Sequence, residues 1–156
     1  MGVSVDHRTF VIERELPGSP GHAFRFWSDH QLKRRWNACH PDWTVEEDWF
    51  DFRVDGGERL AWRMPDGTVQ AMLATFLEIL PRERIVYAYT MRTNGIGISS
   101  SLVTVEFTGR AGVTVMTFTE QAVFGNPSDG DIRETGAGTG FNRLQQVMAE
   151  SELTEG

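Results

Sequence analysis

Two glutamates, Glu78 and Glu120, stand where the sequence otherwise alternates large apolar side chains, and carboxylates in such surroundings can act as a general acid or base. Phe76 lies two positions before the first glutamate and Phe118 two positions before the second, so each pair shares one face of an extended strand. Loss of water on burial raises the pKa of a carboxyl group, whereas an arginine within reach lowers it. The pattern fits buried carboxylates, and it fits equally well two strand ends that reach solvent.

A second charged motif, Asp51 and Arg53, lies between aromatic residues ahead of two glycines in WFDFRVDGG. A three-residue turn from Gly56 to Glu58 gives a register that buries three apolar pairs, namely Val54 with Leu60, Phe52 with Trp62 and Phe50 with Met64. In this register Gly57 takes a positive φ, and Asp51 lies across from Arg63 on the other face. We therefore expect an exposed charge cluster worth at most about 1 kcal/mol rather than a catalytic pair.

The other reactive residues lack the spacing that metal binding or nucleophilic catalysis requires. All four histidines, His7, His22, His30 and His40, lie within the first 40 residues, and none has a partner at metal-ligand spacing. Cys39 directly precedes His40, which is poor geometry for a Cys-His dyad, and the G-x-S-x-G signature is absent. We expect no metal, no cofactor and, with a single cysteine, no intrachain disulfide.

Turn and periodicity signals place the elements that must hold these side chains. Residues 10–16 predict a first strand, and Ser19 followed by Pro20 predicts the N-cap and first turn of a helix. A second short helix follows Ser28 and Asp29 and runs through Leu32 and Trp36. Six strands follow from about Thr44, and a helix ends the chain. Because no repeat or linker interrupts this order, residues 1–156 are predicted to form one domain.

Alternation in the later strands predicts which side chains face the core. A turn at residues 65–67 places four residues inside: Met72, Ala74, Phe76 and Glu78. The next turn then pairs Phe76 with Tyr89 and Glu78 with Tyr87. The following hairpin pairs Phe107 with Thr114, Val105 with Met116 and Val103 with Phe118, which makes Glu120 the next inward residue.

The outer face of the same segment carries Leu73, Leu77 and Ile79 in this register. An apolar stripe in water is unusual for a monomer, so it indicates either a homodimer contact or a β-bulge that returns some of these side chains to the core.

The last helix has an apolar stripe of Ala137, Phe141, Leu144 and Met148. Glycines at 136, 138 and 140 would each cost about 1 kcal/mol inside a helix relative to alanine. The regular helix is therefore expected to begin near Gly140. The alternative is a complete helix, thinned by glycines so that a ligand fits over the sheet.

Composition narrows the class of protein. The chain has 156 residues, 40% of them hydrophobic and 24% charged, with a net charge of -7. An acidic balance disfavours nucleic acid and anionic membranes as partners. No apolar run is long enough to span a bilayer, and the start MGVSVDHRTF lacks the apolar core of a signal peptide, so we expect a cytoplasmic protein.

Four segments in chain order carry a family resemblance: AFRFWSDHQLKRRW, FDFRVDGG, FLEILPRERIVYAY and GFNRLQQVMAE. Over about residues 8–150 they resemble the SRPBCC (START-like) superfamily, in the branch named for homologues of the activator of the heat-shock protein 90 ATPase. This resemblance implies an α+β helix-grip fold, with a curved antiparallel sheet around a long C-terminal helix. Ala74 replaces a glycine of the family pattern, Phe141 a tryptophan, and Asp55 a frequent further glycine, so a ligand cannot be transferred from relatives.

The resemblance implies a cavity between sheet and helix that binds a small hydrophobic or aromatic molecule. The candidate ligand-binding residues are Trp36 near the mouth and Phe52, Trp62, Phe76, Glu78, Tyr87, Tyr89, Phe107, Met116, Phe118, Glu120, Phe141 and Met148 along the wall. The same side chains could simply fill a core. Two alternatives stay open: an enzyme of the polyketide cyclase type, with Glu78 or Glu120 as general acid or base, and a chaperone-interaction module.

Overall fold

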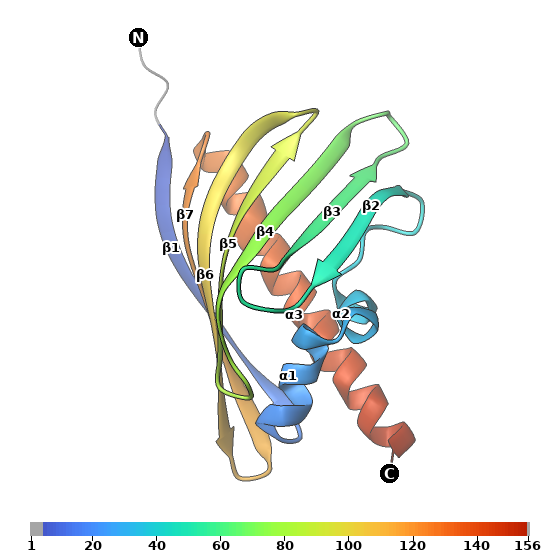
Figure 1. Cartoon of the computed structure of the whole chain (residues 1–156), viewed down its shortest axis with the longest axis vertical. Helices are drawn as coiled ribbons and strands as arrows, with labels where there is room; N and C mark the ends of the chain where they lie inside the picture. Colours follow the sequence, from blue (N-terminus) through green and yellow to red (C-terminus); the bar gives the residue numbers. More distant parts are fainter. Residues whose placement is uncertain (1–4, 156) are drawn as a thin grey trace.

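A seven-stranded antiparallel sheet curves around one long helix (Figure 1). The computed structural model describes residues 5–155, with side chains through Ser151. The strand order across the sheet is β1-β7-β6-β5-β4-β3-β2. The strands are β1 (Asp6–Pro17), β2 (Thr44–Asp51), β3 (Gly57–Arg63), β4 (Val69–Leu80), β5 (Arg84–Thr93), β6 (Ile96–Arg110) and β7 (Val113–Phe124). Helix α3 (Pro127–Glu155) crosses the concave face, and α1 (Pro20–Ser28) and α2 (His30–Trp36) lie beside it. This is the helix-grip fold.

The two short helices begin where the sequence predicts. Ser19 Oγ accepts a hydrogen bond from the backbone N–H of His22 at 3.2 Å, and Pro20 occupies the first turn of α1. Asp29 ends α1 and caps α2, because its carboxylate accepts the backbone N–H of Leu32 at 3.0 Å. This shared cap fixes the angle between the two helices.

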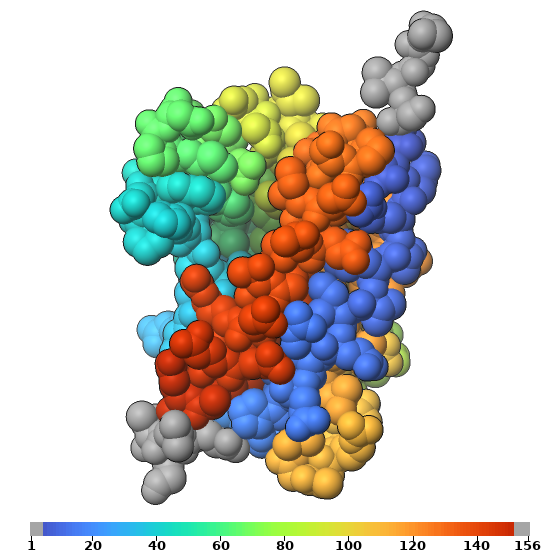
Figure 2. Space-filling view, turned by 180° about the vertical axis from the view of Figure 1, so that it is seen from behind, coloured from blue at the N-terminus to red at the C-terminus, as the bar shows by residue number. Residues whose placement is uncertain are grey.

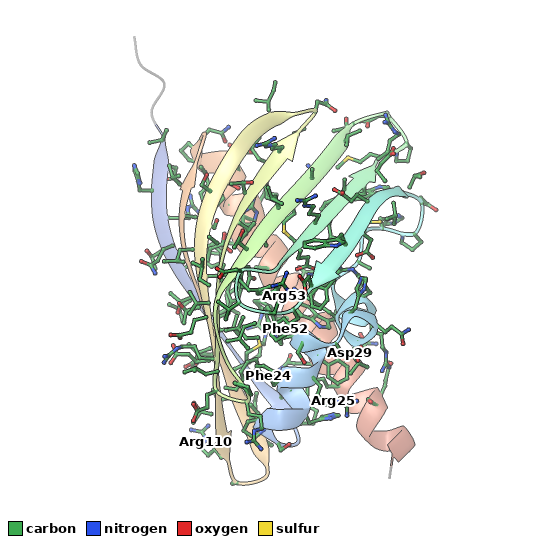
Figure 3. The ribbon with its side chains drawn as sticks, viewed as in Figure 1. Phe24, Arg25, Asp29, Phe52, Arg53 and Arg110 are labelled. Carbon is green, nitrogen blue, oxygen red and sulfur yellow. The ribbon has the colours of Figure 1, made fainter. Side chains whose placement is uncertain are left out.

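The register expected for the β2–β3 hairpin is wrong. Phe50 lies across from Glu58, and Asp51 across from Gly57, so a longer loop separates the two strands. This loop is anchored on β4, where the N–H of Asp55 donates to the carbonyl of Phe76. Phe52 thus reaches the core from the loop and packs on Phe24 of α1, with ring centroids 5.7 Å apart (Figure 3).

The two glycines of this loop are required by close approach rather than by a left-handed turn. A Cβ on Gly57 would overlap the carbonyl oxygen of Ala74, and a Cβ on Gly56 would overlap that of Asp51. The residue with positive φ is Asp55, at 69°, and not Gly57. Asp51 pairs with Arg53 at 2.7 Å instead of with Arg63, which pairs with Glu46 at 2.6 Å.

A β-bulge in β4 corrects the expected faces near Glu78. The β4–β5 register shifts between Phe76 and Glu78, so Phe76 lies across from Tyr87, and Glu78 across from Val86. Ile79 consequently packs against the core, while Leu73 and Leu77 stay outside, each 47% exposed. Met72, Ala74 and Phe76 face the concave side as predicted.

The β6–β7 hairpin turns one residue later than expected, at Ala111 and Gly112, which both have positive φ. Phe107 pairs with Met116, and Val103 pairs with Glu120. This shift of two residues in pairing leaves every side chain on its predicted face, and Glu120 is buried.

Helix α3 begins at Pro127, so the expectation of a start near Gly140 is wrong. Its first half includes all the glycines of this segment. Gly130 has a packing reason, because a Cβ there would overlap the side chains of Arg8 and Asp6 on β1. Arg8 in turn pairs with Asp131 at 2.9 Å.

Candidate functional site

The space between α3 and the sheet is filled at one end and open at the other. Beneath the second half of α3, Phe141, Leu144 and Met148 are buried against a core that includes Met116 and Phe118. Toward the first half of α3, the concave face carries half-buried side chains at Leu60, Trp62, Met72, Tyr89 and Met91. Figure 2 shows a hollow here, between the orange part of α3 and the cyan and green strands. We call it the concave hollow.

At Gly140 the helix α3 has no side chain to cover the sheet. It lies about two helical turns after Arg133 and two before Val147, so the three residues share one helix face. Val147 is buried, and Arg133 contacts the sheet. A Cβ placed on Gly140, however, would meet no atom within 4 Å, and the same holds for Gly136. Gly140 therefore borders the concave hollow from the helix side, and Gly136 faces open space.

A polar cluster around Arg133 joins the first half of α3 to the sheet. The guanidinium donates to the Tyr89 hydroxyl at 2.9 Å and to Ser99 Oγ at 2.8 Å. Tyr89 and Ser101 both donate to one carboxylate oxygen of Glu120 at 2.7 Å, and Arg133 lies 3.5 Å from that oxygen. We call these residues the Arg133 cluster.

The surroundings of Tyr89 in the Arg133 cluster keep its hydroxyl protonated. Burial raises the pKa of the Tyr89 hydroxyl, the Glu120 carboxylate raises it further, and Arg133 opposes both. Tyr89 therefore stays protonated and serves as a donor to Glu120. The buried carboxylate has two hydroxyl donors and a nearby cation, which offset the cost of removing its charge from water.

A second buried cluster lies where α2 meets β2 and β3. Lys33 Nζ contacts Glu58 at 2.6 Å, and Arg34 bridges Glu58 at 2.7 Å and Asp48 at 2.8 Å. Lys33 and Glu58 are almost fully buried. Burial by itself would raise the pKa of Glu58, but the charges of Lys33 and Arg34 outweigh it and hold that pKa below its usual range. We call these four residues the Lys33 cluster.

The predicted site residues divide between core, hollow and outer surface. The buried ones are Trp36, Phe76, Phe107, Met116, Phe118, Glu120, Phe141 and Met148, and the half-buried ones are Phe52, Trp62, Tyr87 and Tyr89. Trp36 lies in the interior, where its indole N–H donates to the carbonyl of Phe26 at 2.8 Å, rather than near a mouth. Glu78 leaves the predicted wall because of the bulge; it pairs with Arg84 at 2.6 Å, and its side chain is 44% exposed.

Arg133, Lys33 and Glu58 were not anticipated from the sequence. Arg133 lies four residues before Ala137, on the same face of α3. A predicted helix that began at Pro127 would therefore have placed Arg133 on the stripe that faces the sheet. Glu58 was placed in a turn by the wrong hairpin register. No local signal pairs Lys33 with Glu58, because the two lie in separate elements.

Two further surface hollows lie away from the predicted wall. One is a groove between β1 and α3 lined by Val11, Ile12, Glu13, Arg14, Asp131, Glu134, Thr135 and Gly138. The other is lined by His7, Arg8, Thr9, Ser100, Gln121, Ala122 and Val123. Among the side chains of residues 5–151, no group of three or more His, Cys, Asp or Glu is arranged to hold a metal ion. In the same part of the chain, none of the helices has the length and hydropathy of a membrane span.

Comparison with known proteins identifies the family. Residues 18–149 match the family described as activator of Hsp90 ATPase homolog 1-like protein, and the chain belongs to this family. A protein of known structure from Rhizobium leguminosarum is 39% identical, with a TM-score of 0.88 over 94% of this chain and 97% of that one. The Mll3558 protein from Rhizobium loti is 36% identical, with a TM-score of 0.85 over 92% and 99% of the two chains.

More distant structures share the fold alone. SA2116 from Staphylococcus aureus is 19% identical, with a TM-score of 0.77 over 97% of this chain and 99% of that one. The comparison with curated proteins gives no match.

Proposed function

We propose that the concave hollow binds a small hydrophobic or aromatic molecule between the sheet and the first half of α3. The observation that carries the proposal is the open space at Gly140, on a helix face that contacts the protein both before and after it. A side chain that pointed there would cover the sheet. Glycine leaves the space free, although it weakens the helix by about 1 kcal/mol.

The chemistry of the sheet side supports an apolar ligand. Leu60, Met72 and Met91 are neighbours across β3, β4 and β5 and are only half-buried. Methionine side chains are flexible and polarizable, so they adapt to ligands of varied shape. Ala74 lies opposite Tyr89, and its small side chain takes up little of the space above the sheet at the centre of this surface.

The Arg133 cluster supports the proposal by holding α3 at a fixed position over the sheet. Its hydrogen bonds connect the helix to β5, β6 and β7, so the helix cannot settle onto Met72 and Met91 without breaking them. A polar brace of this kind preserves the opening that hydrophobic collapse would otherwise close.

Gly140→Phe tests this function directly, with Gly140→Ala as the matched control. Both changes remove the cost of glycine in the helix, but only the phenyl ring fills the hollow. With 2-ethylnaphthalene as the probe in equilibrium dialysis, we expect Gly140→Phe to weaken binding at least about tenfold and Gly140→Ala to retain it. Equal binding by the two variants, both folded by circular dichroism, would place the probe elsewhere. No binding to the unaltered protein would reject the proposal.

Non-enzymatic binding fits the carboxylates better than acid–base catalysis does. Glu78 pairs with Arg84 on the outside, and Glu120 holds Tyr89 and Ser101 through the same oxygen. A general base must lie within reach of the substrate, whereas Glu120 is 1% exposed and lies beneath the Arg133 cluster.

The convex face supports a second proposal, self-association. Trp49, Leu73, Leu77 and Leu102 are exposed, and alternation along the paired strands places them on the face opposite the buried Ala74 and Phe76. A homodimer would cover them, so Leu73→Lys combined with Leu77→Lys is expected to convert a dimer to a monomer in light scattering at micromolar concentration. A monomer before substitution would contradict self-association and favour a chaperone or another protein as the partner of this face.

A further inference from the structure

The outer edge of β1 carries backbone groups without a partner. The strand β1 lies at one edge of the sheet and pairs with β7 alone. The side chain of Arg14 donates to the carbonyl of Glu13 at 2.9 Å, and that of Gln145 donates to the carbonyl of Glu15 at 3.0 Å. Both carbonyls therefore point away from β7, and by alternation the backbone N–H and C=O of Val11 point the same way. Within the described part of the chain, these two groups of Val11 have no hydrogen-bond partner.

Two side-chain bridges join α3 to β1, one on either side of Val11. Arg8 donates to Asp131 at 2.9 Å, and Arg14 donates to Asn142 at 3.0 Å. Between the two bridges lies the groove of about 640 Å³ that has Val11 in its lining. In Figure 2 the blue strand β1 runs beside α3 on this side of the molecule. We call this space the β1–α3 groove.

The opposite edge of the sheet is protected against pairing, whereas the middle of β1 is not. The edge strand β2 has a β-bulge between Val45 and Glu47 and carries three consecutive acidic residues at 46–48. Bulges and charges are the usual devices that prevent an edge strand from pairing with another chain. By contrast, β1 pairs with β7 without a register shift, and the apolar Val11 is 58% exposed. An additional strand can therefore pair with β1.

The charge of the β1–α3 groove favours a basic partner. Three carboxylates line the groove, those of Glu13, Asp131 and Glu134, together with the guanidinium of Arg14. Arg8 bonds to Asp131 at 2.9 Å but lies 3.7 Å from Glu134, whose side chain is 50% exposed. The groove therefore keeps an excess of negative charge, in a chain whose net charge is -7. Lysine and arginine side chains would find counter-charges there, whereas acidic side chains would be repelled.

We propose that the free edge of β1 binds an extended segment of a partner protein, which pairs antiparallel with residues 9–13 as an additional edge strand. Side chains directly across from each other in an antiparallel pair lie on the same face. The residue opposite Val11 therefore lies on the convex face beside an exposed apolar side chain, and its two neighbours point toward the β1–α3 groove. The expected segment alternates β-branched and basic residues. This inference is independent of the concave hollow.

Four heptapeptides labelled with fluorescein at the N-terminus test the proposal by fluorescence anisotropy with the whole protein. The parent peptide is KVKVKVK, and EVEVEVE reverses its charge. One derivative of the parent carries N-methyl groups on its three valines, which removes the N–H donors that face β1. The other carries them on three lysines, which removes donors that face away and leaves the charge unchanged.

Binding is expected to depend on both the backbone donors and the charge. KVKVKVK should bind, and the lysine-methylated peptide should bind within about threefold of it. The valine-methylated peptide should bind at least about tenfold more weakly, because it lacks the hydrogen bonds to β1. EVEVEVE should not bind measurably.

Val11→Pro tests the same contact from the protein side, with Val11→Ala as the matched control. Proline removes the outward N–H and leaves the pairing of β1 with β7 intact, because that N–H does not take part in it. Alanine removes the side chain and keeps the N–H. We expect KVKVKVK to bind Val11→Pro roughly three- to tenfold more weakly than Val11→Ala. If circular dichroism shows that Val11→Pro is unfolded, the two methylated peptides decide the question.

Several outcomes would overturn the proposal. Equal binding of the two methylated peptides would show attraction by charge alone, and binding of EVEVEVE as tightly as KVKVKVK would remove the charge preference. Failure of KVKVKVK to bind, or its equal binding to folded Val11→Pro and Val11→Ala, would exclude pairing at this edge. A fall in molar mass on Val11→Pro substitution, measured by light scattering, would show that the edge pairs with a second copy of this chain instead.

Discussion

The two halves of α3 cover the same sheet in different ways. The second half presents Phe141, Leu144 and Met148, and these side chains are buried in a continuous core. The first half presents Gly136 and Gly140 to open space and touches the concave face through Arg133. One helix thus joins a packed end, where burial provides stability, to an open end, where polar contacts preserve a space.

Side-chain size along one helix can therefore leave one end of a fold packed and the other end open. A change in the packed half should alter stability above all. A change in the open half should alter binding, or should even stabilise the protein.

Phe141→Ala is expected to give the largest effect, a loss of about 3–5 kcal/mol in the free energy of unfolding. The ring is packed against Phe118, with centroids 4.7 Å apart, and against Trp27 at 6.1 Å, so its removal leaves a cavity. Chemical denaturation measures the change. A loss below about 1 kcal/mol would contradict the tight packing of the second half of α3 and remove its contrast with the first half.

Glu58→Gln is expected to be second in size, at about 3 kcal/mol, because it leaves Lys33 buried without its counter-charge. It should also change the pH dependence of stability. The folded-state pKa of Glu58 lies below its ordinary value of 4.5, so its contribution is complete above that pH and is lost as the pH falls through the lowered folded-state pKa. Denaturation from pH 7 to pH 3 should show a shallower decline for the variant, and parallel curves would contradict this assignment.

Arg133→Met should remove about 1–3 kcal/mol by leaving Tyr89, Ser99 and Glu120 without their cation. The effect should be local. Amide hydrogen exchange is expected to accelerate in residues 127–140 and to stay unchanged in residues 141–151. Uniform acceleration along α3 would show that the helix opens as one unit, with no boundary near Gly140.

Gly140→Ala should stabilise the protein by about 1 kcal/mol, because the added methyl group meets open space and favours the helix. Gly130→Ala is the matched contrast within the same helix. Its methyl group would overlap Arg8 and Asp6, so thermal unfolding should shift downward. Stabilisation by both substitutions would remove the distinction between packing glycines and hollow-lining glycines.

Asp51→Ala should have the smallest effect, below about 1 kcal/mol, because its partner Arg53 is largely exposed. The substitution lies outside both halves of the site and serves as a baseline for denaturation measurements. A loss of several kcal/mol would indicate that the loop after β2 contributes to the core through this pair.

Alternation in the sequence predicts the faces of β6, of β7 and of β4 as far as Phe76, and the reason is parity. The pairings predicted for β6 with β7 were wrong by two residues, yet Phe118 and Glu120 face inward as predicted, because a shift of two preserves alternation. The helix starts at Ser19 and Asp29 were also predictable, since a cap is a contact between residues close in sequence. The four motifs in chain order identified the helix-grip fold and the family correctly.

Features that depend on contacts across the sheet could not be read from the sequence. The bulge after Phe76 moved Glu78 out of the predicted wall, because one extra residue reverses every later side chain. Close approach to Ala74, rather than a local turn, explains Gly57. The pairs Lys33–Glu58 and Arg133–Tyr89 join segments far apart in the chain. The sequence contains many other charged residues that could form such pairs. Which of them meet depends on how α2 and α3 settle over the curved sheet, and local sequence does not contain that geometry.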